Sequence, residues 1–134
     1  MPKIEDIEGI GPVYAKKLSD VGVKTVAQLL KIGAGAKGRD ELAEKADIDC
    51  KLILEWVNHA DLYRIKGVGQ EYSDLLEEAG VDTVVELATR NPENLYAKIQ
   101  EVNEAKKLVR RPPSAKMVAD WVHQAKDLPR VVTH

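Results

Sequence analysis

Few residues of this sequence have the type and spacing that catalysis or metal binding requires. His59, His123 and His134 share no metal-ligand spacing, and no nucleotide-binding glycine loop follows a predicted strand. Cys50 is the only cysteine, which excludes an internal disulfide and a zinc site built from several thiolates. It lies on an apolar helical stretch, so we interpret it as a small structural hydrophobe. Because no residues supply a nucleophile, a base and a charge stabiliser together, we expect neither enzyme activity nor a cofactor.

Basic residues gather in one segment, and an acidic segment precedes it. The basic cluster consists of Lys106, Lys107, Arg110, Arg111 and Lys116. Such side chains can bind an anionic polymer through counterion release, without contacts to bases. Residues 68–104 carry nine acidic and two basic side chains, so the cluster can equally be a solvated face that pairs with this stretch. Since the net charge is −2, any attraction to nucleic acid must be local.

Two segments of the chain contain a pair of glycines around one hydrophobic residue. Residues 7–18 align with residues 65–76, and both glycines and one tyrosine coincide. At the same offset residues 21–29 match residues 79–87, and further along residues 49–60 match residues 114–125 at a larger offset. The chain is therefore internally duplicated, and its second copy carries an insertion that holds the basic cluster.

Apolar residues recur at helical spacing between the glycines and prolines, without sustained alternation, which predicts an all-α protein. We expect about five helices in each copy, the first being short and ending at the first glycine. The second helix should span Pro12 to Asp20 in the first copy and Gln70 to Glu78 in the second. Thr25 and Thr83 should cap the third helix, since a hydroxyl accepts an unpaired backbone N–H.

The last two helices of each copy are also marked by their first residues. The fourth should start near Arg39 in the first copy and after Asn91 in the second, where a proline follows the cap. The last should begin at Asp49 and at Ser114. Trp56 and Trp121 occupy equivalent positions on it, and we interpret them, together with Tyr14 and Tyr72, as core anchors.

The duplication predicts two repeats and a tail. The first repeat covers residues 1–61, the second covers residues 62–128, and a short tail covers residues 129–134. Residues 56–65 contain no glycine or proline, so the last helix of the first repeat should run into, or abut, the second repeat. We therefore expect the two repeats to stack closely.

The segment Gly9-Ile10-Gly11-Pro12-Val13-Tyr14-Ala15-Lys16-Lys17-Leu18 resembles the helix-hairpin-helix motif of DNA polymerases, ligases, glycosylases and excision-repair proteins. The resemblance implies that Gly9, Ile10 and Gly11 form a tight turn whose backbone amides hold a DNA phosphate without reading sequence. It also implies that Lys16 and Lys17 assist, and it allows a monovalent cation at the hairpin carbonyls.

The second hairpin, Gly67-Val68-Gly69, departs from this pattern because Glu71 and Asp74 stand near the positions of Val13 and Lys16. Taken whole, the chain resembles a bacterial family whose domain has no assigned function. That resemblance implies a fold of two tandem helix-hairpin-helix, SAM-like repeats, and it transfers no activity.

Two functions compete at this point. One is sequence-independent binding of double-stranded DNA through hairpin amides and nearby basic residues. The alternative is a protein-interaction or scaffold module, which includes self-association. Without an apolar run of membrane-spanning length or a signal sequence, we expect no membrane partner and a cytoplasmic location. We also expect Gly11→Val to destabilise the fold, because the turn should need a positive φ or close backbone approach at Gly11.

Overall fold

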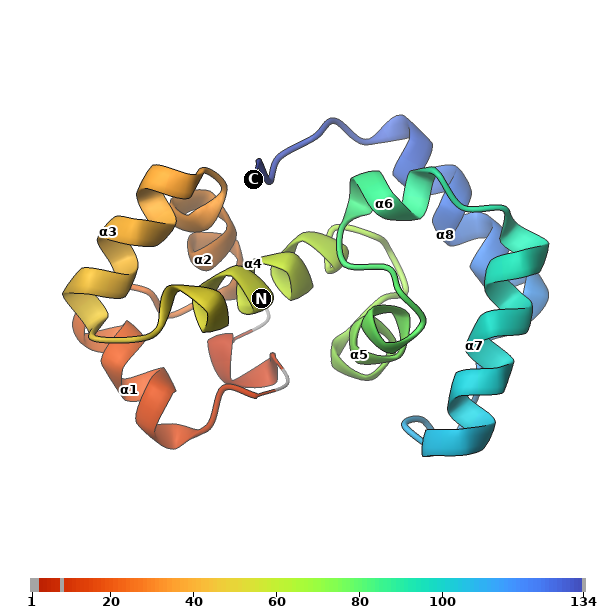
Figure 1. Cartoon of the computed structure of the whole chain (residues 1–134), viewed down its shortest axis with the longest axis horizontal. Helices are drawn as coiled ribbons and strands as arrows, with labels where there is room; N and C mark the ends of the chain where they lie inside the picture. Colours follow the sequence, from red (N-terminus) through yellow and green to blue (C-terminus); the bar gives the residue numbers. More distant parts are fainter. Residues whose placement is uncertain (1–2, 8, 134) are drawn as a thin grey trace. The chain divides into compact units, whose positions relative to one another are not determined.

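The computed structural model describes residues 3–7 and 9–133. Within these residues the chain forms eight α-helices and one short 3-10 helix, and it has no strand beyond an isolated bridge between Lys3 and Thr25 (Figure 1). The helical content is 66%, which confirms the all-α class. In chain order the elements are η1 (Ile4–Asp6), α1 (Pro12–Asp20), α2 (Val26–Gly33), α3 (Ala36–Ala46), α4 (Cys50–Leu62), α5 (Gln70–Glu78), α6 (Val84–Ala88), α7 (Pro92–Lys106) and α8 (Ala115–Asp127).

The chain divides into two compact units. Unit 1 comprises Met1–Asp61 together with Val131–His134, and unit 2 comprises Leu62–Arg130. In unit 1, α3 packs against α1 and α2, and η1 packs against α1. In unit 2, α8 packs against α6 and α7, and α7 also contacts α5. Each unit therefore closes its own aliphatic core.

Local capping chemistry sets the starts of several helices where the sequence predicts them. The Thr25 and Thr83 hydroxyls accept hydrogen bonds from backbone amides of α2 and α6, at 3.1 and 3.3 Å. The Asn91 side chain caps α7 in the same way, and the Ser114 hydroxyl caps α8. The predicted bounds of α1 and α5 are also confirmed.

One helix start was predicted wrongly. The fourth helix of the first copy begins at Ala36, not near Arg39, because only Ala34 and Gly35 form the connection, while Gly33 and Gly38 lie inside helices. A Cβ on Gly33 would lie 2.4 Å from Cγ2 of Val57, and a Cβ on Gly38 would lie 2.0 Å from the Ile32 carbonyl oxygen. Gly33 therefore leaves room for the Val57 side chain, and Gly38 allows the backbone of α3 to approach the Ile32 carbonyl closely.

The expected short helix before each glycine pair is also corrected. In the first copy it is the three-residue η1, which ends before Ile7. In the second copy the residues after α4 form consecutive turns, in which the Ile65 amide donates to the Leu62 carbonyl and the Val68 amide to the Ile65 carbonyl. The described part of unit 2 therefore holds four complete α-helices, α5 to α8, and not five.

The two tryptophans occupy equivalent positions in the cores of the two units. Both are buried, and each packs against the tyrosine of its own hairpin helix. The ring centroids of Tyr14 and Trp56 lie 5.1 Å apart, and those of Tyr72 and Trp121 lie 5.2 Å apart, in tilted arrangements that aromatic pairs favour. Their prediction as repeated core anchors is confirmed.

Candidate functional site

The two glycine pairs form turns of the same geometry. Gly9 and Gly67 both have φ +94°, a left-handed conformation that favours glycine. The hydrophobic residue that follows, Ile10 or Val68, is buried, and its amide donates to the carbonyl three residues earlier at 3.1 Å. Each turn is thus fixed by one buried hydrophobic side chain and one backbone hydrogen bond.

The second glycine of each pair has a different role from the one expected. Gly11 has φ −85° and ψ −175°, which is extended backbone, and a Cβ built there would meet nothing within 4 Å. The expectation that Gly11 needs a positive φ or close approach is therefore wrong. The chain reverses at Gly9, and Gly11 must then be extended because it is the N-cap of α1.

The glycine N-caps leave the starts of the hairpin helices open. Neither Gly11 nor Gly69 offers a side-chain acceptor, whereas Thr25, Thr83 and Ser114 cap their helices. Pro12 has no N–H, so the amides of the first turn of α1 begin at Val13. Gly11 and Pro12 are exposed. An exposed helix start of this kind attracts anions, because its amides and the helix dipole both point outward.

The two lysines of α1 differ in how they are held. The Lys16 ammonium lies 3.7 Å from a carboxylate oxygen of Asp20, and its side chain is 80% exposed, so the ion pair is weak. The Lys17 ammonium instead donates to the Asp47 carbonyl at 3.0 Å, next to the C-terminal end of α3. Lys16 is therefore free to meet an anion near α1, while Lys17 braces α1 against α3.

The second hairpin lies beside part of the basic cluster. The Tyr72 hydroxyl, in the first turn of α5, donates to the Arg111 carbonyl at 2.9 Å. The Asn103 side chain fixes the same loop, because it accepts from the Val109 amide at 3.0 Å and donates to the Val109 carbonyl at 3.2 Å. Arg110 and Arg111 are thus exposed on a well-anchored loop. Glu71, at the start of α5, opposes any anion there.

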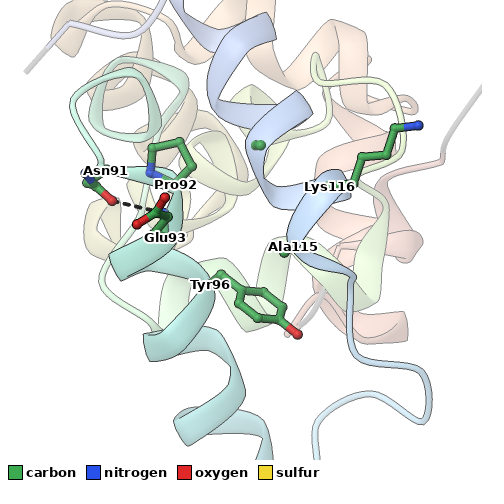
Figure 2. Close-up of a pocket in the computed structure, with 7 residues that line it drawn as sticks. Asn91, Pro92, Glu93, Tyr96, Ala115 and Lys116 are labelled. Atoms are coloured by element: carbon green, nitrogen blue, oxygen red, sulfur yellow. Dashed lines mark hydrogen bonds between the residues drawn. The ribbon is translucent and has the colours of Figure 1, made fainter.

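The other three residues of the basic cluster, Lys106, Lys107 and Lys116, each have a different environment. Lys106 forms an ion pair with Glu78, and Lys107 ends α7 in a left-handed conformation with φ 52°. Lys116 is exposed on α8 and lines a surface pocket of about 580 Å³ between the starts of α7 and α8. The remaining residues that line this pocket are Asn91, Pro92, Glu93, Tyr96, Ala115 and Ala119. In Figure 2 the Lys116 side chain extends away from Glu93 and Tyr96, so charged groups do not converge in the pocket.

One side chain that has an unusual environment in the structure was not identified from the sequence. Arg39 is only 4% exposed, although arginine is rarely buried. It donates to the carbonyls of Gly33 and Ala34 at the end of α2, at 2.8 and 3.0 Å, and to the Thr133 carbonyl at 2.6 Å. No sequence pattern signalled this, because the acceptors are backbone carbonyls and one lies 94 residues away.

Cys50 is half-buried and is not activated as a nucleophile. Its thiol donates to a carboxylate oxygen of Asp40 at 3.2 Å. This hydrogen bond, with a smaller effect of burial and of the Asp40 charge, raises the pKa of Cys50 above its usual value. A raised pKa keeps the sulfur protonated, and the thiol is the unreactive form.

Comparison with known proteins identifies a family without assigning an activity. A segment of 56 residues is 36% identical to the poly(3-hydroxyalkanoate) polymerase subunit PhaC of Haloferax mediterranei. The matched segment covers 42% of this chain and 10% of that protein. The chain thus spans about a tenth of the length of this relative. No solved structure matches. Among the described residues, no helix has the length and apolar character needed to cross a membrane. The family model described as "Domain of unknown function (DUF4332)" matches residues 8–128, and the chain belongs to this family.

Proposed function

We propose that this protein is a non-catalytic module that holds the backbone of double-stranded DNA without reading its sequence. In this proposal the two glycine turns belong to tandem helix-hairpin-helix repeats, and the turn before α1 makes the main phosphate contact. The observation that carries the proposal is the open, glycine-capped start of α1, which is exposed and faces no side-chain acceptor of its own. A phosphate oxygen can accept from such amides.

Charge favours the first hairpin over the second. Lys16 is exposed one turn into α1 and is held only by a weak pair with Asp20. In unit 2, Glu71 lies in the first turn of α5, and the neighbouring residues are mainly acidic. Arg110 and Arg111 belong to the loop that Tyr72 holds near the start of α5. Their two positive charges offset only part of this acidity. A second, weaker DNA contact at this loop is consistent with their exposure.

A second candidate function rests on Val13. Its side chain is 69% exposed and directly follows Gly11 and Pro12, which are also exposed. In this alternative, the exposed Val13 side chain packs against a partner protein as part of an apolar interface centre. The 56-residue similarity to one polymerase subunit is compatible with such a module inside a larger protein.

A DNA titration with matched variants tests the proposal. We expect fluorescently labelled duplex DNA to bind weakly, independently of sequence, and with an affinity that falls steeply between about 50 and 200 mM salt. Lys16→Gln should weaken binding and reduce the salt dependence. Lys98→Gln is the matched control, because Lys98 is also exposed and pairs with a carboxylate on its own helix, Glu101, but lies in the acidic unit.

A second pair of variants isolates the backbone contact. Gly11→Ala adds a methyl group at the open start of α1, and Gly69→Ala adds one at the equivalent position of α5; neither meets an atom within 4 Å. Both variants should fold normally, and Gly11→Ala should lose more DNA affinity. Absence of binding at low salt, together with a stable oligomer in a sizing experiment, would refute DNA binding and favour the protein-contact alternative.

A further inference from the structure

The C-terminal segment is bound to unit 1 as an extended peptide would be. Val131–His134 belongs to this unit although the preceding residues belong to unit 2. Along residues 131–133 the burial alternates: Val131 is half-buried, Val132 is 3% exposed, and Thr133 is exposed. One inward side chain between two outward ones is the pattern of an extended segment lying on a surface.

Hydrogen bonds hold this segment through both main-chain polar groups of Thr133. The Thr133 amide donates to the Ala34 carbonyl at 2.8 Å, and the Thr133 carbonyl accepts from Nη2 of Arg39 at 2.6 Å. The Thr133 hydroxyl adds a longer contact of 3.4 Å to the Ala34 carbonyl. One donor and one acceptor for the same residue, together with burial of the preceding side chain, are the elements of extended-peptide recognition.

Unit 1 holds this site in place with its own residues. Nη1 of Arg39 is already fixed by the Gly33 and Ala34 carbonyls, so Nη2 is positioned before any peptide arrives. Gly35 borders the segment, because a Cβ there would lie 4.0 Å from the Thr133 hydroxyl oxygen, an ordinary contact distance. If the segment leaves, Nη2 of Arg39 loses the Thr133 carbonyl and the buried Val132 side chain becomes exposed to water, which favours rebinding of the same or an equivalent segment.

We propose that unit 1 contains a receptor site for a short extended peptide, formed by Ala34, Gly35 and Arg39, and that the C-terminal segment of a second copy can occupy it. The occupant must offer a small aliphatic side chain at the position of Val132 and a free backbone N–H and C=O at the next residue. The chain's own segment meets these requirements and occupies the site in the structure. Exchange of such a segment between copies is a low-cost route to association.

The experiment frees the site and supplies the segment separately. The full chain with Val132→Asp, labelled with ¹⁵N, is titrated with an unlabelled peptide of residues 128–133. NMR is suited to the weak affinity expected, because a tethered segment gains an effective concentration of about millimolar that a free peptide lacks. We expect saturable shifts at the Ala34 and Gly35 amides and at the Arg39 guanidinium. In the unmodified chain the same shifts should need at least about tenfold more peptide, since its own segment competes.

Two controls test whether the shifts come from peptide bound at this site. A peptide carrying Asp in place of Val132 should cause no shift, and hydrogen exchange in the unmodified chain should show protection of the Thr133 amide. If Val132→Asp does not fold, Thr133→Pro replaces it, because this variant removes the Thr133 N–H and leaves Val132 intact. A folded variant that shows no shifts, or a Thr133 amide that exchanges freely, would overturn the receptor site.

The role of a second copy has its own test. An unlabelled Arg39→Gln chain has a weakened site and an intact segment, so it should produce the same shifts in labelled Val132→Asp chain as the peptide does. The mixture should also contain a 1:1 complex that neither variant forms alone. Binding of the peptide without binding of the Arg39→Gln chain would overturn the second copy as the occupant.

Discussion

Replacement of single glycines by alanine should separate the two positions of the hairpin turn. Gly9 has φ +94°, whereas Gly11 has φ −85° and open space around it. An alanine in a left-handed conformation costs about 1–2 kcal/mol. The new methyl group at position 9 would lie 3.5 Å from Nε1 of Trp56, an ordinary contact, so the backbone alone sets the cost.

We therefore expect Gly9→Ala to lose about 1 kcal/mol or more of folding free energy and Gly11→Ala to stay within about 0.5 kcal/mol of the unmodified chain. Gly67→Ala should cost slightly more than Gly9→Ala, because its methyl group would lie 3.3 Å from Nε1 of Trp121. In urea, a loss of about 1 kcal/mol lowers the unfolding midpoint by about 0.5–1 M.

The assay can follow the two units separately, because the chain has two tryptophans and each unit contains one of them. Incorporation of 5-fluorotryptophan gives each unit its own ¹⁹F signal during urea unfolding. Gly9→Ala should shift the transition of Trp56, and Gly67→Ala should shift that of Trp121. An unchanged Trp56 transition in Gly9→Ala, or a greater loss in Gly11→Ala than in Gly9→Ala, would refute the assignment of the left-handed turn to the first glycine.

Three further outcomes test other parts of the structure. Arg39→Gln should destabilise unit 1 by about 2–3 kcal/mol in urea unfolding, because three buried or half-buried carbonyls lose a charged donor; a change below about 0.5 kcal/mol would contradict this. Asn103→Ala should cost about 1–3 kcal/mol, since the Val109 amide and carbonyl lose their partners, and limited proteolysis should then cut the loop after α7 faster. Cys50 should react with iodoacetamide more slowly than free cysteine at pH 8, because its pKa is raised, and Asp40→Asn should speed the reaction by removing the main cause; an equal rate in both chains would exclude that cause.

Local features of the sequence were sufficient to predict most of the helices, apart from the start of α3 and the short element before each glycine pair. The hydroxyls of Thr25, Thr83 and Ser114 reach amides only three residues away, so their role follows from residue type and position. The apolar period and the duplication then indicated an all-α chain with Trp56 and Trp121 as equivalent anchors. These features depend on neighbours along the chain, and they are visible before folding.

The candidate site could be predicted only in outline. The sequence marked the glycine pairs, but only the backbone angles assign the left-handed conformation to Gly9 and the open helix start to Gly11. The sequence also treated Lys16 and Lys17 alike. The structure separates them, because the acceptor of Lys17 is a carbonyl 30 residues away.

The features that could not be predicted are contacts between segments that are distant in the sequence. The sequence alone determined where the helices with side-chain caps start, since caps and apolar periods act over three or four residues. It could not show that Tyr72 holds the Arg111 carbonyl, or that Arg39 is buried under the carbonyls of Gly33, Ala34 and Thr133. Every residue has a backbone carbonyl, so residue type does not reveal which one a distant side chain will find, and only the packing of each unit decides it.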